Sequence, residues 1–239
     1  MTVKIAKIIA TSFYYRTVRN NTVLTGNPPV FTLHSQNFKN DDEIKKLILF
    51  NIEQENLCNP GLPVDIVFVN NDVGNVDGNN FVKGLNNKKL KNGKVIAIHN
   101  NSNSGWSYGA FNKGFQELQN DYDYFIFTED DVIIAKDNYA KIGLNTFVNK
   151  ENCGFVSYWG LCFSQFENLS KKDSIHAHGA SGFTSSDILR KVTKKYGRLP
   201  HSDSFNKDDY NKIILEGEIK FTNVILKMGY SLTEVPNNQ

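Results

Sequence analysis

Short apolar stretches rich in β-branched and aromatic residues recur along the chain, separated by longer segments in which apolar and polar residues mix. Stretches of about four to eight such residues are typical of buried β-strands. We therefore predict strands at residues 3–10, 64–69, 94–98, 124–127 and 154–158.

The segments between these strands space their apolar residues three or four positions apart, as one face of an α-helix does. The clearest case is 41–57, where Ile44, Leu47 and Leu57 share a face behind an acidic first turn, which the helix dipole favours. Further helices are expected at 107–118, at 138–148 with Asp137 as N-cap, from Ser185 or Ser186 onward, and at 216–227 with Gly229 just beyond its end.

Strands that alternate with helices predict an α/β fold, with a mainly parallel central sheet flanked by helices on both faces. The 239 residues suit a single domain of this kind. Two segments, 74–93 and 163–174, lack a clear period, and we expect surface loops there, the second a mobile flap. In open α/β sheets ligands bind beyond the carboxyl ends of the strands. The loops at that edge are 11–13, 70–72, 100–105 and 129–131.

The composition is that of an ordinary globular protein, with 40% hydrophobic and 22% charged residues. A formal net charge of +2 gives no electrostatic footprint for nucleic acid, and the basic clusters at 88–94 and 190–198 are predicted to be solvated faces. No apolar stretch approaches the roughly 20 residues that span a bilayer. Membrane contact is therefore expected to be peripheral at most.

The cysteines and the first residues both favour a cytoplasmic protein. Cys58, Cys153 and Cys162 are an odd number without metal-ligand spacing, which predicts reduced thiols. Residues 1–10 alternate lysine with apolar residues, a pattern typical of a strand and not of a signal peptide.

An acidic step, Glu129-Asp130-Asp131, directly follows the predicted strand 124–127. Three successive carboxylates repel one another unless a cation or hydrogen-bond donors neutralise them. A divalent ion that binds carboxylate and diphosphate oxygens would do so, and it would stabilise the charge on a leaving nucleoside diphosphate. The alternative is a solvated turn in which Asp130 or Asp131 caps a helix.

The run FIFTEDDVIIAKDNYAKI, residues 125–142, resembles the strand, acidic motif and following helix of GT-A glycosyltransferases. Glu-Asp-Asp is a variant of their Asp-X-Asp motif and resembles the form found in inverting N-acetylglucosaminyltransferases. The resemblance implies a single Rossmann-like GT-A domain over 1–239, with a nucleotide-sugar-binding half at 1–131 and an acceptor-binding half at 132–239. It also implies an Mn²⁺ or Mg²⁺ ion held by Asp131, with Glu129 and Asp130 binding ribose or the donor sugar.

Three further segments are similar to family 2 glycosyltransferases and imply nucleotide contacts. The opening IIATSFYYR places Thr11 and Phe13 near the nucleobase, and NSGWSYGAFNKGF matches an Asn-X-Gly, Ala, Asn-X-Gly pattern that includes Asn103. This copy is one residue longer between Gly105 and Asn112. In VDIVFVNND, Asn70 and Asn71 occupy the usual Asp-Asp pair, so Asn71 and Asp72 become the candidates for base recognition.

The segment EGEIKFTNVILKMGYSL is similar to the family 2 helix that begins with the catalytic base and ends in Gly-Tyr, which places Glu218 at the base position. The family usually has Asp there. A carboxylate suits an inverting transfer, because a base must remove the acceptor hydroxyl proton as its oxygen attacks the anomeric carbon. The alternative is that Glu216 and Glu218 are first-turn acids favoured by the helix dipole.

His176 and His178 alternate along a predicted strand, so both could face one side. We prefer contact with acceptor or phosphate over a metal site, which usually needs a further ligand nearby. Residues 179–183 resemble the small-residue segment that shapes the GT-A acceptor pocket, which makes His178, Gly179 and Ser181 acceptor-binding candidates. Trp159 is expected in the core, and Trp106 is open to either role.

The combined prediction is a hexosyl- or N-acetylhexosaminyltransferase that is metal-dependent and inverting. It would move a sugar from a nucleoside diphosphate sugar to a hydroxyl of a glycan, a lipid-linked acceptor or a small molecule. A retaining enzyme would share the fold and the metal step without needing Glu218 as base. A sugar-1-phosphate nucleotidyltransferase would be expected to carry a glycine-rich phosphate loop, and 11–16 contains no glycine. A sugar-binding module without turnover is the alternative outside the enzymes.

Overall fold

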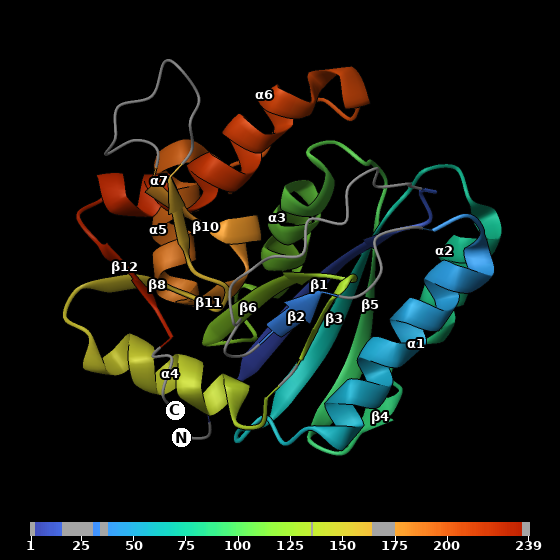
Figure 1. The fold of residues 1–239 in the computed structure, drawn as a ribbon, viewed down its shortest axis with the longest axis horizontal. Helices are drawn as coiled ribbons and strands as arrows, with labels where there is room; N and C mark the ends of the chain where they lie inside the picture. The colour runs from blue at the N-terminus through green and yellow to red at the C-terminus, as the bar shows by residue number, and fades with distance from the viewer. Residues whose placement is uncertain (1–2, 16–30, 34–37, 135, 164–174, 236–239) are drawn as a thin grey trace.

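A computed structural model describes residues 3–15, 31–33, 38–134, 136–163 and 175–235 (Figure 1). Four parallel strands form the centre of the main sheet: β1 (Ile5–Ser12), β3 (Val64–Asn71), β5 (Gly93–Asn100) and β6 (Tyr124–Glu129). Around them lie β4 (Lys89–Leu90), β8 (Cys153–Ser157), β11 (Gly182–Ser185) and β12 (Ser231–Glu234). Within the described residues the sheet order is β12-β8-β11-β6-β1-β3-β5-β4.

Two small antiparallel pairs accompany the sheet: β2 (Phe31–Leu33) with β7 (Val132–Ile134), and β9 (Leu161–Phe163) with β10 (Ile175–Ala177). The α-helices are α1 (Asp41–Leu57), α2 (Val76–Gly84), α3 (Trp106–Leu118), α4 (Tyr139–Asn149), α5 (Ser186–Tyr196), α6 (Tyr210–Ile214) and α7 (Lys220–Lys227). Shorter elements are the 3₁₀ turns η1 (His178–Ala180) and η2 (Lys207–Asp209), and the π-helical turn η3 (Leu215–Ile219).

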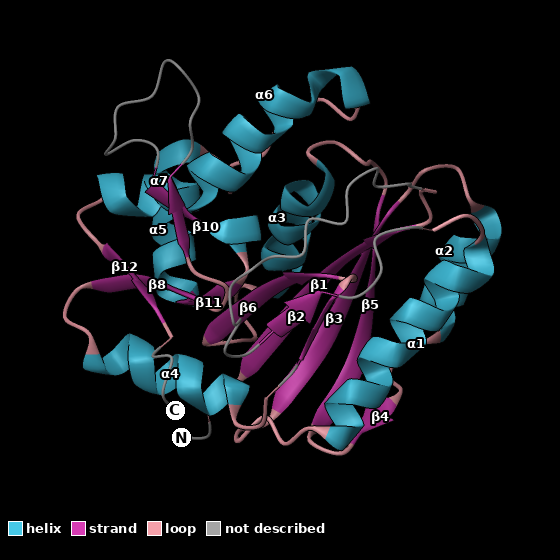
Figure 2. Ribbon diagram, viewed as in Figure 1, coloured by secondary structure: helices cyan, strands magenta, loops and turns pink. Residues whose placement is uncertain are grey.

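Helices cover both faces of the sheet (Figure 2) because the side chains of each strand alternate between the faces. On one face Ala6, Ile8 and Ala10 of β1 pack in a cluster with residues of α3, α5 and α7. On the other face Ile9 lies with α1 and α2, and Ile5 lies with α4. The predicted α/β class, with a mostly parallel sheet between two helical layers, is therefore confirmed.

Local capping explains where two predicted helices begin. The Asn40 side chain caps α1 by accepting from the Glu43 amide at 3.0 Å, ahead of the acidic first turn. Ser185 caps α5 by accepting from the Ile188 amide at 3.3 Å, as predicted. Gly229, with φ of +91°, follows the end of α7.

Several sequence expectations were wrong. Asp137 is not an N-cap, since Asn138 holds that position and Asp137 Oδ1 instead accepts from the Asn59 amide at 2.7 Å. Leu57 was assigned to the buried face of its helix, but it is 67% exposed at the last turn. Segment 74–93 is not a loop, because it holds α2 and β4. Residues 164–174 of the expected flap are not among the residues that the structure describes.

The order of the central strands creates a switch point between β1 and β6. From β1 the chain moves outward to β3 and β5, and it then returns to place β6 on the other side of β1. Connections leave in opposite directions at such a point, which opens a crevice beyond the carboxyl ends of the two strands. The end of β6 carries the acidic step.

In the described part of the chain, no helix is both long and apolar enough to cross a membrane.

Candidate active site

The acidic step lies at the switch point, fixed to β1 and α1. Asp130 Oδ2 accepts a hydrogen bond of 2.7 Å from Thr11 Oγ1, and the Asp130 amide donates to the Ala10 carbonyl at 3.1 Å. Asn51 Nδ2 of α1 donates to the Asp130 carbonyl at 2.7 Å. Asp130 and Asp131 are 4% and 2% exposed, so this is a buried, ordered turn and not a solvated one.

The acidic step could bind a metal ion together with a diphosphate. The described residues contain no group of three His, Cys, Asp or Glu side chains able to enclose a metal. Mg²⁺ and similar ions are often held by one or two carboxylates, with substrate phosphates and water completing the shell. The carboxylates of Glu129 and Asp131 in this turn could supply that share.

An asparagine network joins the ends of β3 and β5 to the start of α3. Asn71 is 3% exposed, accepts from Asn100 Nδ2 at 2.7 Å, and donates to the Trp106 carbonyl at 2.8 Å and to Asn103 Oδ1 at 3.2 Å. Asparagine side chains can both donate and accept, and Asn71 does both here. Asn71 and Asn103, predicted separately, lie in direct contact.

Asp72 closes the turn after β3. Its Oδ1 accepts from the Gly74 amide at 2.8 Å and from Asn79 Nδ2 at 2.9 Å, and its Oδ2 lies 3.6 Å from His99 Nε2. The hydrogen bonds from Asn79 and Gly74 lower the pKa of Asp72. The carboxylate is thus held ionised, with one oxygen used in the turn.

Phe13 does not join the polar edge. Its ring is 4% exposed and packs in the core with α1 and α2, 6.4 Å from the Phe81 ring. A Cβ at Gly78 would come within 2.3 Å of the Phe13 ring, so glycine is required for this close approach.

Glu218 lies in η3, where three elements meet around its carboxylate. Glu218 Oε1 accepts from the Gly179 amide of η1 at 2.7 Å. It also lies 3.5 Å from His178 Nδ1 and 3.7 Å from His176 Nε2 of β10, and the side chain is 13% exposed. β10 ends at Ala177, so the two histidines do not alternate along one strand as predicted, yet both reach Glu218.

The helix-dipole explanation for Glu218 is contradicted by the start of the helical run. Ile214 and Ile219, at the two junctions, have helical φ and ψ, so α6, η3 and α7 form one run that begins at Tyr210. Glu218 therefore lies two turns inside the run, beyond the first turn where the dipole acts. Single π turns inside α-helices are frequent at functional sites.

The charges of Glu218 and Glu129 both act on two tyrosines, Tyr108 and Tyr210. Tyr108 of α3 is buried, and its pKa lies well above the ordinary value. Burial is the largest cause, and the charges of Glu218 and Glu129 come next. Burial and the same two carboxylates also raise the pKa of Tyr210. Sequence reasoning assigned neither tyrosine a role, although Tyr108 lies inside the segment 103–115.

The predicted acceptor segment lies beside the strand that leads into the acidic step. β6 contacts η1, and Gly179 in η1 has φ of +58°. Ser181 is 1% exposed, and its Oγ has no hydrogen-bond partner among the described residues. The Trp159 ring lies 5.2 Å from the His178 ring and is partly buried against the core beside α4.

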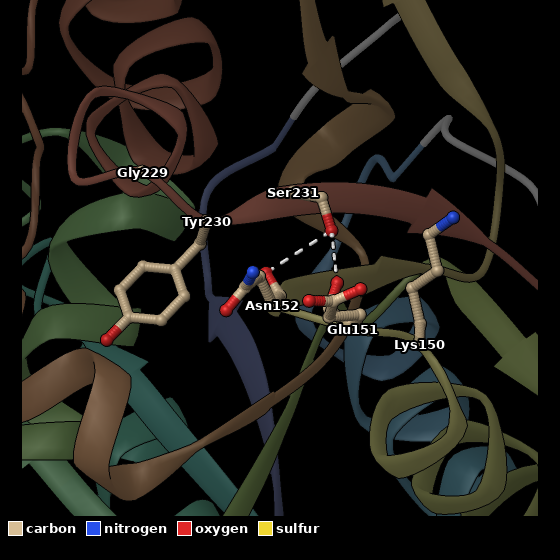
Figure 3. Close-up of a pocket in the computed structure, with 6 residues that line it drawn as sticks. All are labelled: Lys150, Glu151, Asn152, Gly229, Tyr230 and Ser231. Atoms are coloured by element: carbon tan, nitrogen blue, oxygen red, sulfur yellow. Dashed lines mark hydrogen bonds between the residues drawn. The ribbon is translucent and has the colours of Figure 1, made fainter.

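A separate pocket, whose lining residues are drawn in Figure 3, lies at the opposite ends of the strands from the acidic step. Its volume is about 440 Å³, and it is formed by the turns before β8 and β12, where Ser231 Oγ donates to the Asn152 carbonyl at 3.2 Å. Because β8 runs parallel to β6, these turns lie at the amino ends of the strands. The lining residues are Lys150, Glu151, Asn152, Gly229, Tyr230 and Ser231.

No protein-family model matches the chain, and a search of curated proteins finds no match either.

Proposed function

We propose that this protein is a metal-dependent glycosyltransferase that moves a sugar from a nucleoside diphosphate sugar to an acceptor hydroxyl, with inversion. The observation that carries the proposal is the convergence of Glu129 and Glu218 on Tyr108 and Tyr210. These carboxylates come from elements about 90 residues apart in sequence, and Glu129 ends β6 at the switch point, where ligands of such sheets bind.

The two sides of the crevice suit the two substrates. Asn71, Asn103 and Asp72 gather polar groups at the ends of β3 and β5, which favours a nucleotide there. Glu218, His178 and Gly179 gather on the other side of β6, which favours the acceptor. When bound between them, Mn²⁺ or Mg²⁺ would neutralise charge on the leaving diphosphate.

In the transfer step, Glu218 accepts the proton of the acceptor hydroxyl as that oxygen forms its bond to the anomeric carbon. The bond from the anomeric carbon to the diphosphate oxygen breaks at the same time, and its electron pair leaves with the nucleoside diphosphate. The hydrogen bond from the Gly179 amide fixes the Glu218 carboxylate before substrate arrives. Attack from the face opposite the leaving group inverts the anomeric centre, which proton NMR of the product would show. A product that retains the anomeric configuration would mean that Glu218 is not the general base.

A thermal-shift screen tests donor binding. The chain would be heated with UDP-, GDP-, CMP- and dTDP-sugars, each with and without Mn²⁺. We expect one nucleotide class to raise the melting temperature in the presence of Mn²⁺, because a ligand at a hundredfold excess over its Kd adds about 2.7 kcal/mol of apparent stability. An equal melting temperature with every sugar nucleotide would contradict the proposal, as would a response to the CMP-sugars alone, since these carry a single phosphate.

A further inference from the structure

The rings of Trp106 and Tyr210 lie side by side at the border of the proposed site, and the backbone of Phe205 is bonded to Trp106; we name these three residues the entrance aromatics. Trp106 Nε1 donates to the Phe205 carbonyl at 3.3 Å, and the Trp106 and Tyr210 ring centroids are 6.0 Å apart with the planes inclined at 49°. Phe205 is 68% exposed and Tyr210 is 55% exposed. Large apolar rings left open to solvent in one group commonly mark a binding surface.

Helix geometry directs Tyr210 and Glu218 to the same side of their helical run. An α turn takes about 3.6 residues, and a π turn, with its i→i+5 hydrogen bonds, takes about 4.4. One turn of each therefore spans about eight residues, the separation of Tyr210 and Glu218. In Figure 1 this run lies beside α3, which it contacts through η3.

Trp106 is held in a strained conformation that fixes its ring. Its φ is +50°, a value that bulky residues rarely adopt. Its amide donates to the Asn103 carbonyl at 3.2 Å, and its carbonyl accepts from Asn71 Nδ2 at 2.8 Å. Such strain persists where surrounding contacts over-determine it, and it concentrates at functional sites.

The segment that carries Phe205 is fastened to the start of α3. The Gly105 amide donates to the Ser204 carbonyl at 2.8 Å, and a Cβ at Gly105 would lie 2.8 Å from the Ser202 carbonyl oxygen. The backbone at Gly105, with φ of +66°, therefore favours glycine. These contacts hold the backbone that carries Trp106 against the backbone that carries Phe205 without a ligand, which reduces the entropy lost on binding.

We propose that the entrance aromatics bind a sugar ring of an uncharged glycan acceptor, and this inference rests on the proposed transferase function. The C–H faces of a pyranose ring are apolar and pack on aromatic rings, while its hydroxyls remain free to bond to carboxylates at the rim. The flanking charges nearly balance, because Lys207 and Lys212 accompany Asp208 and Asp209 on the turn and helix that hold Tyr210. The surface therefore offers no excess of positive charge for an acceptor phosphate or an anionic lipid surface.

Tryptophan fluorescence can report binding directly, because the chain has only two tryptophans. In Trp159→Phe the remaining tryptophan is Trp106. That variant would be titrated, without donor or metal, with neutral trisaccharides: chitotriose, cellotriose and maltotriose. We expect a saturable emission change with at least one of them.

Matched variants identify the surface. Adding Tyr210→Ala should weaken trisaccharide binding by about tenfold, whereas Tyr210→Phe, which keeps the ring, should retain it. Tyr196→Ala is the control, since Tyr196 is 41% exposed on α5 and lies outside the entrance aromatics. Melting temperatures would show that each variant is folded.

The outcomes separate this inference from the proposed function. If no trisaccharide binds while the unsubstituted chain still hydrolyses a nucleotide sugar, the glycan surface is wrong and the transferase stands. An emission change with phosphatidylglycerol vesicles and none with trisaccharides would likewise overturn the glycan surface. Trisaccharide binding without any binding or turnover of sugar nucleotides would support the surface and overturn the transferase.

Discussion

At the residue scale, Glu218 has the surroundings that best suit the proposed base. It receives the Gly179 amide and two imidazoles from separate elements, and it is largely shielded from water. Glu216 lies two residues earlier in η3 and has different surroundings. Asp203 is the main cause that raises the pKa of Arg198, and the charge of Glu216 adds a smaller effect in the same direction. The two glutamates therefore make a matched pair.

Glu218→Gln should slow turnover by about 10²- to 10⁴-fold with little change in donor affinity, because the amide keeps the size and the Gly179 hydrogen bond but cannot accept the proton. Glu216→Gln should turn over normally. Steady-state rates and donor calorimetry on both variants check this. Normal rates in both would place the base elsewhere and favour retention, whereas loss in Glu216→Gln alone would assign the base to Glu216.

The sequence proposed Glu218 and the acidic step as site residues through motif resemblance, but it could not show that Glu218 and Glu129 both act on Tyr108 and Tyr210. Sequence reasoning missed Tyr108 and Tyr210 because the carboxylates that act on them, Glu218 of η3 and Glu129 of β6, are distant in sequence. Phe13 was predictable as a core residue, since period-two alternation places it on the same face as Ile5 and Ile9.

At the element scale, the π turn and α3 fit together through one glycine. A Cβ at Gly217 would lie 2.2 Å from the ring of Tyr108, which is itself buried. Gly217 thus allows η3 to pack closely against Tyr108 of α3, whose pKa the charges of Glu218 and Glu129 raise after the larger effect of burial.

Gly217→Ala should lower stability by about 1 to 3 kcal/mol through overpacking, and it should reduce turnover because Tyr108 must shift. Gly84→Ala at the exposed end of α2 is the control, since a Cβ there meets nothing within 4 Å. Urea unfolding of both variants measures the difference. Equal midpoints and equal turnover would mean that the Tyr108 contact is unimportant.

Elements with weak local patterns escaped prediction. The sequence of α2, VDGNNFVKG, contains two glycines and two asparagines, which are poor helix formers. Tertiary contacts override that preference, because Asn75 caps the helix and Gly78 packs under Phe13. β11 is short and half polar, and its buried Thr184 depends on a 2.6 Å hydrogen bond to the Gly154 carbonyl.

At the scale of the whole molecule, a buried polar group joins the sheet to two helices. Lys7 Nζ of β1 lies 2.5 Å from Glu55 Oε1 of α1, and the Tyr139 hydroxyl of α4 donates to Glu55 Oε2 at 2.7 Å. Lys7 is 0% exposed and Glu55 is 3% exposed. Charges this deep are tolerated only when they are paired.

Lys7→Met should cost about 3 to 5 kcal/mol, because the Glu55 carboxylate is then buried without its cation. Lys7→Met combined with Glu55→Met should recover much of that loss, since an apolar pair avoids the desolvation cost. Denaturant unfolding of the parent, the single and the double variant tests this coupling. Additive losses in the double variant would contradict it.

Alkaline pH should destabilise the protein. Burial is the main cause that raises the pKa of Tyr108, Tyr139 and Tyr158 well above the ordinary value of about 10. Above pH 10 the unfolded chain releases these protons while the native chain keeps them, so stability falls as pH rises through the interval up to the raised pKa values. Melting curves from pH 9 to about 11.5, with tyrosinate absorbance, check this. Ionisation of all ten tyrosines near pH 10 in the folded state would contradict it.

The most direct test of the central claim is release of nucleoside diphosphate from the donor that the thermal-shift screen identifies, measured with and without Mn²⁺ in the parent and in Asp131→Asn. The parent should release product only with metal. The variant should be slower by roughly 10²-fold or more at an unchanged melting temperature, because a neutral amide replaces an anionic ligand of similar shape. An Asp131→Asn variant with the parent's rate and the parent's Mn²⁺ dependence would contradict the assignment of this site.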